Sequence, residues 1–167
     1  VDSALSMFNK ESIISRINKG ENVETNEMFN TVFSLAEDIA DNTNGAFDIT
    51  VAPLVNAWGF GFKTGNPPNK ATIDSLRSVV GYKKVSLKNN HISKTDPRVM
   101  LDCSAIAKGY GCDVVAALLR RHGIDNYLVE IGGEVVAKGI SEKRLPWKIG
   151  VTKPSDDSLA MDKELQT

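Results

Sequence analysis

Cysteine is scarce in this chain, since only Cys103 and Cys112 occur among its 167 residues. Two cysteines are too few for a disulfide framework, and neither stands in a C-x-x-C pair or has a matching histidine pair for zinc. We interpret both as buried thiols that act as small hydrophobic side chains. The cysteines therefore give no support to a zinc site and do not indicate a redox compartment.

Long apolar runs and an excess of one charge are also missing. No apolar stretch is long enough to cross a bilayer. The 20 basic and 21 acidic residues leave a formal net charge of -1, which gives no electrostatic reason to expect nucleic acid or an anionic membrane as a partner. Hydrophobic residues make up 41% of the chain, as in a globular domain that can bury a core.

The common catalytic signatures are absent as well. The sequence has no G-x-S-x-G, H-E-x-x-H or phosphate-loop motif. His91 and His122 have no partner at the spacing of a metal site or a catalytic triad, so we assign both histidines to surface roles. Function must therefore be sought in less common motifs.

Two long helices are predicted. The first follows an N-cap at Thr25 or Asn26 and ends near Gly45, which suits a left-handed C-terminal cap. Its apolar residues recur at the spacing of one helix face: Phe29, Val32, Phe33, Ala36, Ile39 and Ala40. The second long helix covers residues 106–121 and ends at Gly123.

Shorter helices are predicted after Ser12 and after Thr72, which are favourable N-cap residues. Asn89 and Asn90 tolerate positive φ and predict a hairpin turn between Val85 and Ile92. Other strands are predicted at residues 46–55, where Pro53 limits the strand, and at 98–103, 127–131, 135–139 and 147–151. This mixed order of elements predicts an α+β fold with a largely antiparallel sheet and covering helices.

The head of the second long helix is the most informative segment, reading Leu-Asp-Cys-Ser-Ala-Ile-Ala-Lys-Gly from residue 101. Helix N-termini favour anions, so a phosphate ligand suits this place. Asp102 or Ser104 could instead simply cap the helix. Capping does not explain Lys108 in the first helical turn, where a cation is unfavourable without an anionic partner. The segment alone favours an anion site only slightly.

Residues 45–50 offer a second possible site directly after a helix. A flat ring system could pack on Phe47, and the Asp48 carboxylate could accept hydrogen bonds from a base or a ribose. The simpler interpretation is a helix C-cap followed by an ordinary strand with Phe47 in the core. The residues alone favour this simpler interpretation.

Two further segments have weak signals. Glu130 and Glu134 flank the Gly132-Gly133 pair, and paired carboxylates can do acid–base work or recruit a metal, although a tight turn with solvated charges is the simpler interpretation. The run Trp-Gly-Phe-Gly-Phe at residues 58–62 fits an aromatic lid with glycine hinges. It fits equally a loop pinned by its own side chains, which is commoner.

The sequences of these segments and their order in the chain resemble the ApbE family, the FAD:protein FMN transferases, also known as thiamine-biosynthesis lipoproteins. The matching segments are 5–8, 12–18, 45–55, 58–61, 102–110, 127–134 and 146–150, which span almost the whole chain in the family's order. The resemblance implies an ApbE-like, T-fold-related α+β fold around a cleft that binds FAD with Mg²⁺. The family's Met-Gly-Thr segment and its metal-binding Asp and Thr segment are not visible. We therefore expect residues 1–167 to be a single flavin-transferase domain truncated at both ends.

The resemblance also implies roles for particular residues. It implies contacts with the flavin nucleotide for Phe8, Ala46, Phe47, Asp48, Asp102 and Lys108. The backbone carbonyl of Ala105 matches a position that helps to hold Mg²⁺, and hard cations do take oxygen ligands. Glu134 falls beside the family's cleft. No catalytic residue is assigned.

The expected reaction is magnesium-dependent transfer of FMN from FAD to a Thr or Ser hydroxyl of an acceptor protein, with release of AMP. Two alternatives keep the ligand: an FAD pyrophosphatase that gives FMN and AMP, and a non-catalytic flavin-binding module. A third is an interaction domain without flavin affinity. The resemblance further implies an exported protein, lipid-anchored at a bacterial membrane and facing the periplasm or the cell exterior, with an anchor outside this chain.

Overall fold

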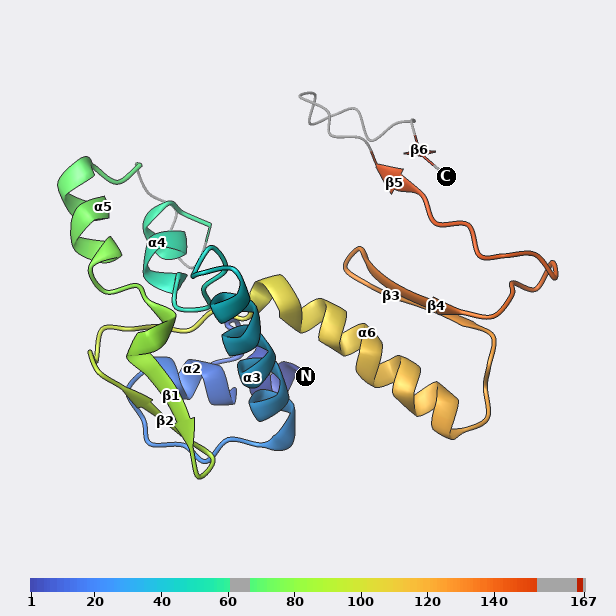
Figure 1. Cartoon of the computed structure of the whole chain (residues 1–167), viewed down its shortest axis with the longest axis horizontal. Helices are drawn as coiled ribbons and strands as arrows, with labels where there is room; N and C mark the ends of the chain where they lie inside the picture. Colours follow the sequence, from blue (N-terminus) through green and yellow to red (C-terminus); the bar gives the residue numbers. More distant parts are fainter. Residues whose placement is uncertain (61–66, 153–164, 167) are drawn as a thin grey trace. The chain divides into compact units, whose positions relative to one another are not determined.

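The structure is a computed structural model that describes residues 1–60, 67–152 and 165–166. The chain divides into two compact units, Val1–Tyr110 and Gly111–Thr167. Helices and three two-stranded antiparallel sheets make up the described elements (Figure 1), which confirms the predicted α+β class. None of the described helices has the length and apolar character of a bilayer-spanning segment.

The first unit begins with three helices, α1 (Asp2–Leu5), α2 (Ile13–Asn18) and α3 (Glu27–Asn42). Ser12 caps α2 by accepting a hydrogen bond from the backbone N–H of Ser15, and Asn26 caps α3 by accepting one from Phe29. The predicted apolar face of α3 is buried, and Phe29 and Phe33 stack with their ring centroids 6.1 Å apart. The predicted cap at Ser12 and the Asn26 alternative for the cap of α3 are therefore confirmed. The predicted apolar face is confirmed as well, with Ile39 only half-buried.

The chain leaves α3 through a left-handed turn. Asn44 and Gly45 have φ values of 51° and 80°, and the Gly45 N–H donates to the Ala40 carbonyl at 2.7 Å. Residues 46–50 do not form the predicted strand, because the Asp48 carboxylate folds the backbone into a turn by accepting the Thr50 N–H. A short helix, α4 (Ala52–Ala57), follows at once, with a proline in its first turn.

The next segment contains α5 (Lys70–Arg77), the 3-10 helix η1 (Tyr82–Lys84) and a hairpin of β1 (Val85–Lys88) and β2 (His91–Lys94). The hairpin turn is confirmed, since Asn89 and Asn90 have φ values of 49° and 59°. The predicted cap of α5 is wrong: Asn69 caps it, and Thr72 donates its N–H to that cap.

Residues 98–103 were expected to form a strand, but only a parallel bridge between Val51 and Met100 is present. The long helix α6 (Ser104–Arg121) follows, and it confirms the second helix prediction. One cluster of buried side chains forms the core of the first unit, and its members run from Ala4 to Cys103. The core therefore packs α1, α2 and α3 with the segments that follow α3.

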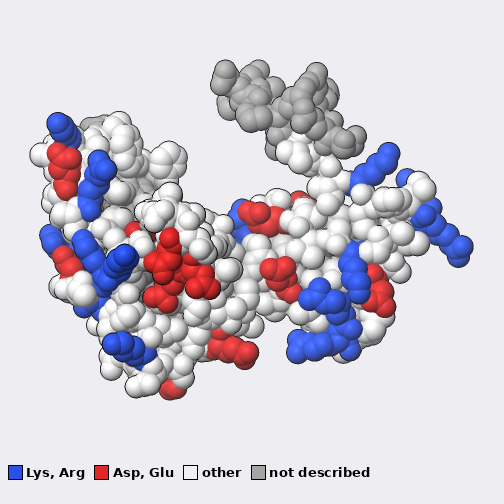
Figure 2. All heavy atoms as spheres, viewed as in Figure 1, with Lys and Arg blue, Asp and Glu red and all other residues white. Residues whose placement is uncertain are grey.

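The second unit contains the rest of α6 and the hairpin of β3 (Tyr127–Ile131) and β4 (Glu134–Lys138). Gly132 and Gly133 turn this hairpin with φ values of 57° and 91°. A strand at residues 147–151 was predicted, but only β5 (Val151–Thr152) forms, paired with β6 (Leu165–Gln166). Figure 2 shows acidic and basic side chains interspersed across the face in view, in keeping with the balanced net charge.

Candidate functional site

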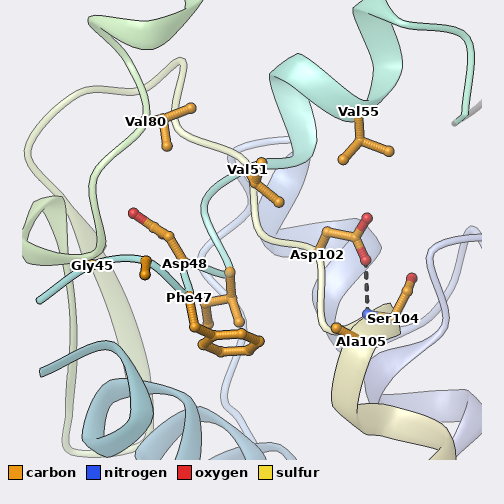
Figure 3. Close-up of a pocket in the computed structure, with 11 residues that line it drawn as sticks. Gly45, Phe47, Asp48, Val51, Val55, Val80, Asp102, Ser104 and Ala105 are labelled. Carbon is orange, nitrogen blue, oxygen red and sulfur yellow. Dashed lines mark hydrogen bonds between the residues drawn. The ribbon is translucent and has the colours of Figure 1, made fainter. Parts of the chain in front are cut away.

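A pocket of about 560 Å³ lies in the first unit (Figure 3). It is lined by Gly45, Ala46, Phe47, Asp48, Ile49, Val51, Val55, Val80, Asp102, Ser104 and Ala105. Its size is in the range of small-molecule sites, and its lining combines apolar side chains with a few polar groups. The pocket therefore joins two segments that the sequence predicted separately, residues 45–50 and the head of α6.

The first wall is shaped by the turn after α3. A side chain at Gly45 would meet the Tyr82 ring, because a Cβ built there lies 3.3 Å from that ring, and the φ of 80° further favours glycine. Figure 3 shows the Phe47 ring among the side chains that line the pocket. The backbone path at residue 45 thus brings Phe47 to the pocket.

Asp48 faces away from Asp102, toward the side of the pocket where Val80 lies (Figure 3). Its Oδ1 accepts from the Thr50 N–H at 2.7 Å and from the Thr50 hydroxyl at 2.6 Å, and its Oδ2 accepts from the Tyr82 N–H at 2.8 Å. Three hydrogen bonds therefore hold this carboxylate in the wall. The structure gives Asp48 a bracing role, and its predicted contact with a nucleotide stays a prediction.

Thr50 completes this brace. Its side chain is fully buried, and its hydroxyl accepts the Gly81 N–H at 2.7 Å while donating to Asp48. A buried hydroxyl that both donates and accepts is fully satisfied, so it can tie two chain segments together at low cost. The wall at residues 45–51 is thereby fastened to residues 81–82.

The second wall is the head of α6. Asp102 Oδ1 accepts the Ser104 N–H at 2.8 Å (Figure 3), and the Cys103 carbonyl accepts from Ile106 and Ala107. Asp102 therefore caps the helix, as the simpler sequence interpretation held. Ser104 and Ala105 are nevertheless exposed at the pocket, so capping and ligand binding are compatible here.

The strand-like segment before α6 is held from two sides. The Asp102 N–H donates to the Ile49 carbonyl at 2.7 Å. On the other side, the Asn18 side chain bonds both backbone groups of Leu101, each at 2.8 Å. Sequence reasoning placed Asn18 in a family-like segment but assigned it no role, because a contact across 83 residues leaves no local signal.

Phe8 and Lys108 do not line this pocket. Phe8 is 77% exposed and lies at a separate hollow of about 430 Å³ with Met7, Lys10, Ser15, Asn18, Lys19 and Met100. Lys108 is exposed on α6, beyond Ala105. The flavin contacts that the resemblance implies for Phe8 and Lys108 stay predictions.

The two cysteines are buried, as predicted. Burial and the neighbouring Asp102 carboxylate raise the pKa of the Cys103 thiol to about 12. Cys112 donates its thiol to the Glu134 carbonyl at 3.1 Å, within the second unit. Neither thiol is poised as a nucleophile, because Cys103 stays protonated at neutral pH and Cys112 is inaccessible.

The remaining motifs add little to the site. The Gly132-Gly133 pair forms a hairpin turn in the second unit. Of the aromatic run, Gly61 and Phe62 lie outside the described residues, and Trp58 and Phe60 are exposed. His122 is exposed, and half-buried His91 contacts the Asn89 carbonyl through Nδ1 at 2.8 Å, which matches the surface roles assigned to them.

Two of the residues that line the pocket, Asp102 and Ser104, have side-chain oxygens of the kind that Mg²⁺ prefers. Among residues 1–60, 67–152 and 165–166, no three His, Cys, Asp or Glu side chains gather into a metal cluster. The residues present therefore fit a magnesium ion that takes further ligands from phosphates and water, and not an all-protein cage.

Comparison with known proteins explains why these segments lie together. The ApbE family model matches residues 1–167. An FAD:protein FMN transferase from Vibrio cholerae is 37% identical over 171 residues, covering 99% of this chain and 51% of that protein. One from Haemophilus influenzae is 40% identical over 166 residues, covering 93% and 48%. The chain spans about half the length of these relatives.

Solved structures agree with the sequence relatives. The flavin transferase ApbE from Vibrio cholerae matches with a TM-score of 0.85 at 38% identity, covering 92% of this chain and 51% of that one. The ApbE protein of Thermotoga maritima matches with a TM-score of 0.82 at 30% identity, covering 94% and 53%. Because the ApbE family model matches this chain from its first residue to its last, the chain belongs to the ApbE family.

Proposed function

We propose that the protein transfers FMN from FAD to a Ser or Thr hydroxyl of an acceptor protein and releases AMP, in a magnesium-dependent reaction. The observation that carries this proposal is the pocket where Ala46, Phe47 and Asp48 meet Asp102 and Ala105. Relatives named FAD:protein FMN transferases support the flavin and the protein acceptor.

The reaction exchanges the phosphoanhydride bond of FAD for a phosphoester bond to the acceptor. The acceptor hydroxyl oxygen forms a bond to the FMN phosphorus of FAD, the bond from that phosphorus to the bridging oxygen breaks, and AMP leaves with that oxygen. The hydroxyl proton passes to a base or to solvent. Such a transfer needs mainly positioning and neutralisation of phosphate charge.

The described residues supply the positioning. Phe47 offers an aromatic face and apolar valines surround it, so the pocket can take a flat ring. The head of α6 offers a helix N-terminus for the diphosphate, and Lys108 adds a positive charge on the same helix. Asp102 can orient the nucleotide by accepting a hydrogen bond from it. No catalytic base is assigned among the described residues.

Magnesium is needed in this proposal for an electrostatic reason. Asp48 and Asp102 bring two carboxylates to the pocket, and a diphosphate placed there would be repelled without a compensating cation. The Ala105 carbonyl would hold the ion together with phosphate oxygens and water. When bound, Mg²⁺ neutralises charge that develops on the diphosphate.

The test is to incubate the full protein with FAD, Mg²⁺ and an acceptor domain, and to measure AMP and the mass of the acceptor. An acceptor gaining the mass of FMN, with equal AMP, is expected. AMP without an adduct would instead indicate an FAD pyrophosphatase. FAD binding that needs no metal and gives no AMP would indicate a non-catalytic flavin-binding module. The expected export and lipid anchoring stay predictions.

A further inference from the structure

Asn18 makes a polar contact across 83 residues of the chain, with the residue directly before Asp102 of the candidate site. Its Nδ2 donates to the Leu101 carbonyl at 2.8 Å, and its Oδ1 accepts the Leu101 N–H at 2.8 Å. One side chain therefore satisfies both backbone polar groups of a residue that is fully buried. The Asn18 amide and the Leu101 backbone exchange two hydrogen bonds, as two directly opposite residues of an antiparallel strand pair do.

The opposite edge of the same segment is paired with backbone. The Asp102 N–H donates to the Ile49 carbonyl at 2.7 Å, and Met100 bridges to Val51. Neighbouring residues of an extended segment direct their N–H groups to opposite edges. Asn18 therefore takes the place that a second neighbouring strand would occupy, and the segment is fixed on both edges.

Asn18 is itself firmly placed. It ends α2, whose last turn is tied to β2 by the Lys94 ammonium group, which donates to the Ile17 carbonyl at 2.8 Å. The Asn18 Nδ2 also lies 3.5 Å from the Met7 sulfur. A side chain anchored in this way can transmit the position of α2 to Leu101.

We propose that Asn18 is a positioning residue, which sets Asp102 and the head of α6 in register for the flavin nucleotide. The route is short: Asn18 holds Leu101, Asp102 follows it directly, and the Asp102 carboxylate caps Ser104 at the pocket. This inference rests on the proposed function for the identity of the ligand. It adds a residue that does not line the pocket.

Two substitutions separate this role from general stability. Asn18→Leu removes both hydrogen bonds to Leu101 while keeping a similar size. The matched control, Lys94→Met, removes a different tie of α2 and leaves the bonds to Leu101 in place. In the full protein, hydrogen exchange is measured for the peptide covering residues 98–107, and FAD affinity is measured with Mg²⁺ at a temperature where every variant is folded.

Asn18→Leu is expected to speed exchange at Leu101, Asp102 and the first turn of α6, and to weaken FAD binding by roughly 10- to 100-fold, because small misplacements of a site are costly. Lys94→Met is expected to lower thermal stability and to change these two readouts much less than Asn18→Leu does, because both bonds from Asn18 to Leu101 remain. Unchanged exchange and affinity in Asn18→Leu, or equal changes in Lys94→Met, would overturn the proposal.

Asn18→Asp supplies a pH readout that loss of packing does not share. The introduced carboxylate repels the Leu101 carbonyl, but its protonated form can donate to that carbonyl and accept the Leu101 N–H. The defect in FAD affinity, relative to the unsubstituted protein, is therefore expected to shrink between about pH 8 and about pH 5. A defect independent of pH would contradict the role of these two bonds.

The outcomes distinguish this inference from the proposed function. If the unsubstituted protein binds no FAD, the proposed function fails, and the ligand assigned here fails with it. The exchange pattern then still decides whether Asn18 positions Asp102. If Asn18→Leu does not fold, the pH series of Asn18→Asp gives the same decision.

Discussion

The two units of the chain bury their apolar residues very differently. In residues 1–110 the apolar face of α3 is enclosed, and Phe33 is 1% exposed. In residues 111–167 large apolar side chains remain at the surface of the described chain, and Leu145 is 55% exposed. Both units contain a well-formed antiparallel hairpin. A hairpin can therefore form without being buried. A two-stranded hairpin supplies no side chains that cover its own faces, so it depends on other elements to pack against it.

The candidate pocket lies in the unit that has the core. A binding site needs its walls held by packed neighbours, since a loosely supported wall loses the geometry that gives affinity. The turn at residues 45–51 and the segment at 100–102 both rest on buried residues, among them Ile49 and Leu101. We therefore expect substitutions in the first unit to reduce stability and activity more than substitutions in the second unit. Pairs of substitutions, one in each unit, test this expectation.

Phe33→Ala is expected to have the largest effect, with a loss of about 3–5 kcal/mol in the free energy of unfolding. Phe33 is buried and stacks on Phe29, so its removal leaves a cavity. Leu118→Ala in the second unit removes a side chain that is 46% exposed, and should cost less than about 1 kcal/mol. Urea unfolding followed by circular dichroism measures both. Equal losses of unfolding free energy in the two variants would contradict the difference in burial between the units.

Asp102→Asn should reduce the specificity constant for AMP release from FAD by roughly 10- to 100-fold, or about 1.5–3 kcal/mol, if the proposed function holds. The amide oxygen can still cap Ser104, so the helix should persist while the charge is lost. The control is Asp125→Asn, which removes an exposed acid of the second unit that pairs with Lys138. A comparable loss of activity in the control would refute the assignment of the site to the first unit.

Thr50→Val should lower the free energy of unfolding by about 1–3 kcal/mol, because it leaves the buried Gly81 N–H without its acceptor. Thr50→Ser keeps the hydroxyl and should restore most of this loss. In the second unit, Tyr127→Phe removes a hydroxyl bonded to the exposed Arg120, and should cost at most about 1 kcal/mol. Thermal unfolding ranks the three variants, and a harmless Thr50→Val would show that the brace is dispensable.

Removing an ion pair at the surface should have the smallest effect on stability, and the effect should be similar in the two units. Hydrogen bonds from Arg98 lower the pKa of Asp96 to about 2, and those from Lys138 lower the pKa of Asp125. A lowered pKa in the folded state stabilises the protein above the unfolded-state pKa, and this stabilisation is lost as pH falls through the folded value. For Asp96 the window is therefore roughly pH 4 to 2.

Acid unfolding of Asp96→Asn and Asp125→Asn, at low and at high salt, measures this contribution. Both variants should unfold within a small fraction of a pH unit of the unsubstituted protein, because exposed pairs are screened by solvent and salt. A large shift in one variant alone would reveal a difference in electrostatics between the units.

Local patterns predicted the elements well where one residue's chemistry decides the outcome. The caps at Ser12 and Asn26, the apolar face of α3 and the Asn89-Asn90 turn were all predicted and confirmed. The cap of α5 was missed because Thr72 and Asn69 are both good cap residues three positions apart.

The predicted strands at 46–55 and 98–103 failed for different reasons, the first local and the second tertiary. Apolar and polar residues alternate over 47–51, but Asp48 turns the chain there by accepting the Thr50 N–H. The bridge between the two segments joins Val51 and Met100. The segment at 98–103 finds one edge partner in a side chain, that of Asn18. Pattern reasoning cannot foresee a side chain that substitutes for a strand.

The sequence by itself determined the helix after Ser12, the two long helices, the Asn89-Asn90 turn and the two segments that line the pocket, because caps, turns and periodicity act between residues close in the chain. Only the tertiary structure decided which chemistry-bearing residues meet there: Asp48 is turned into a brace, Phe8 lies at another hollow, and Asn18 joins the support of Asp102. The physical reason is that such contacts depend on how distant segments pack, and packing leaves no trace in local spacing.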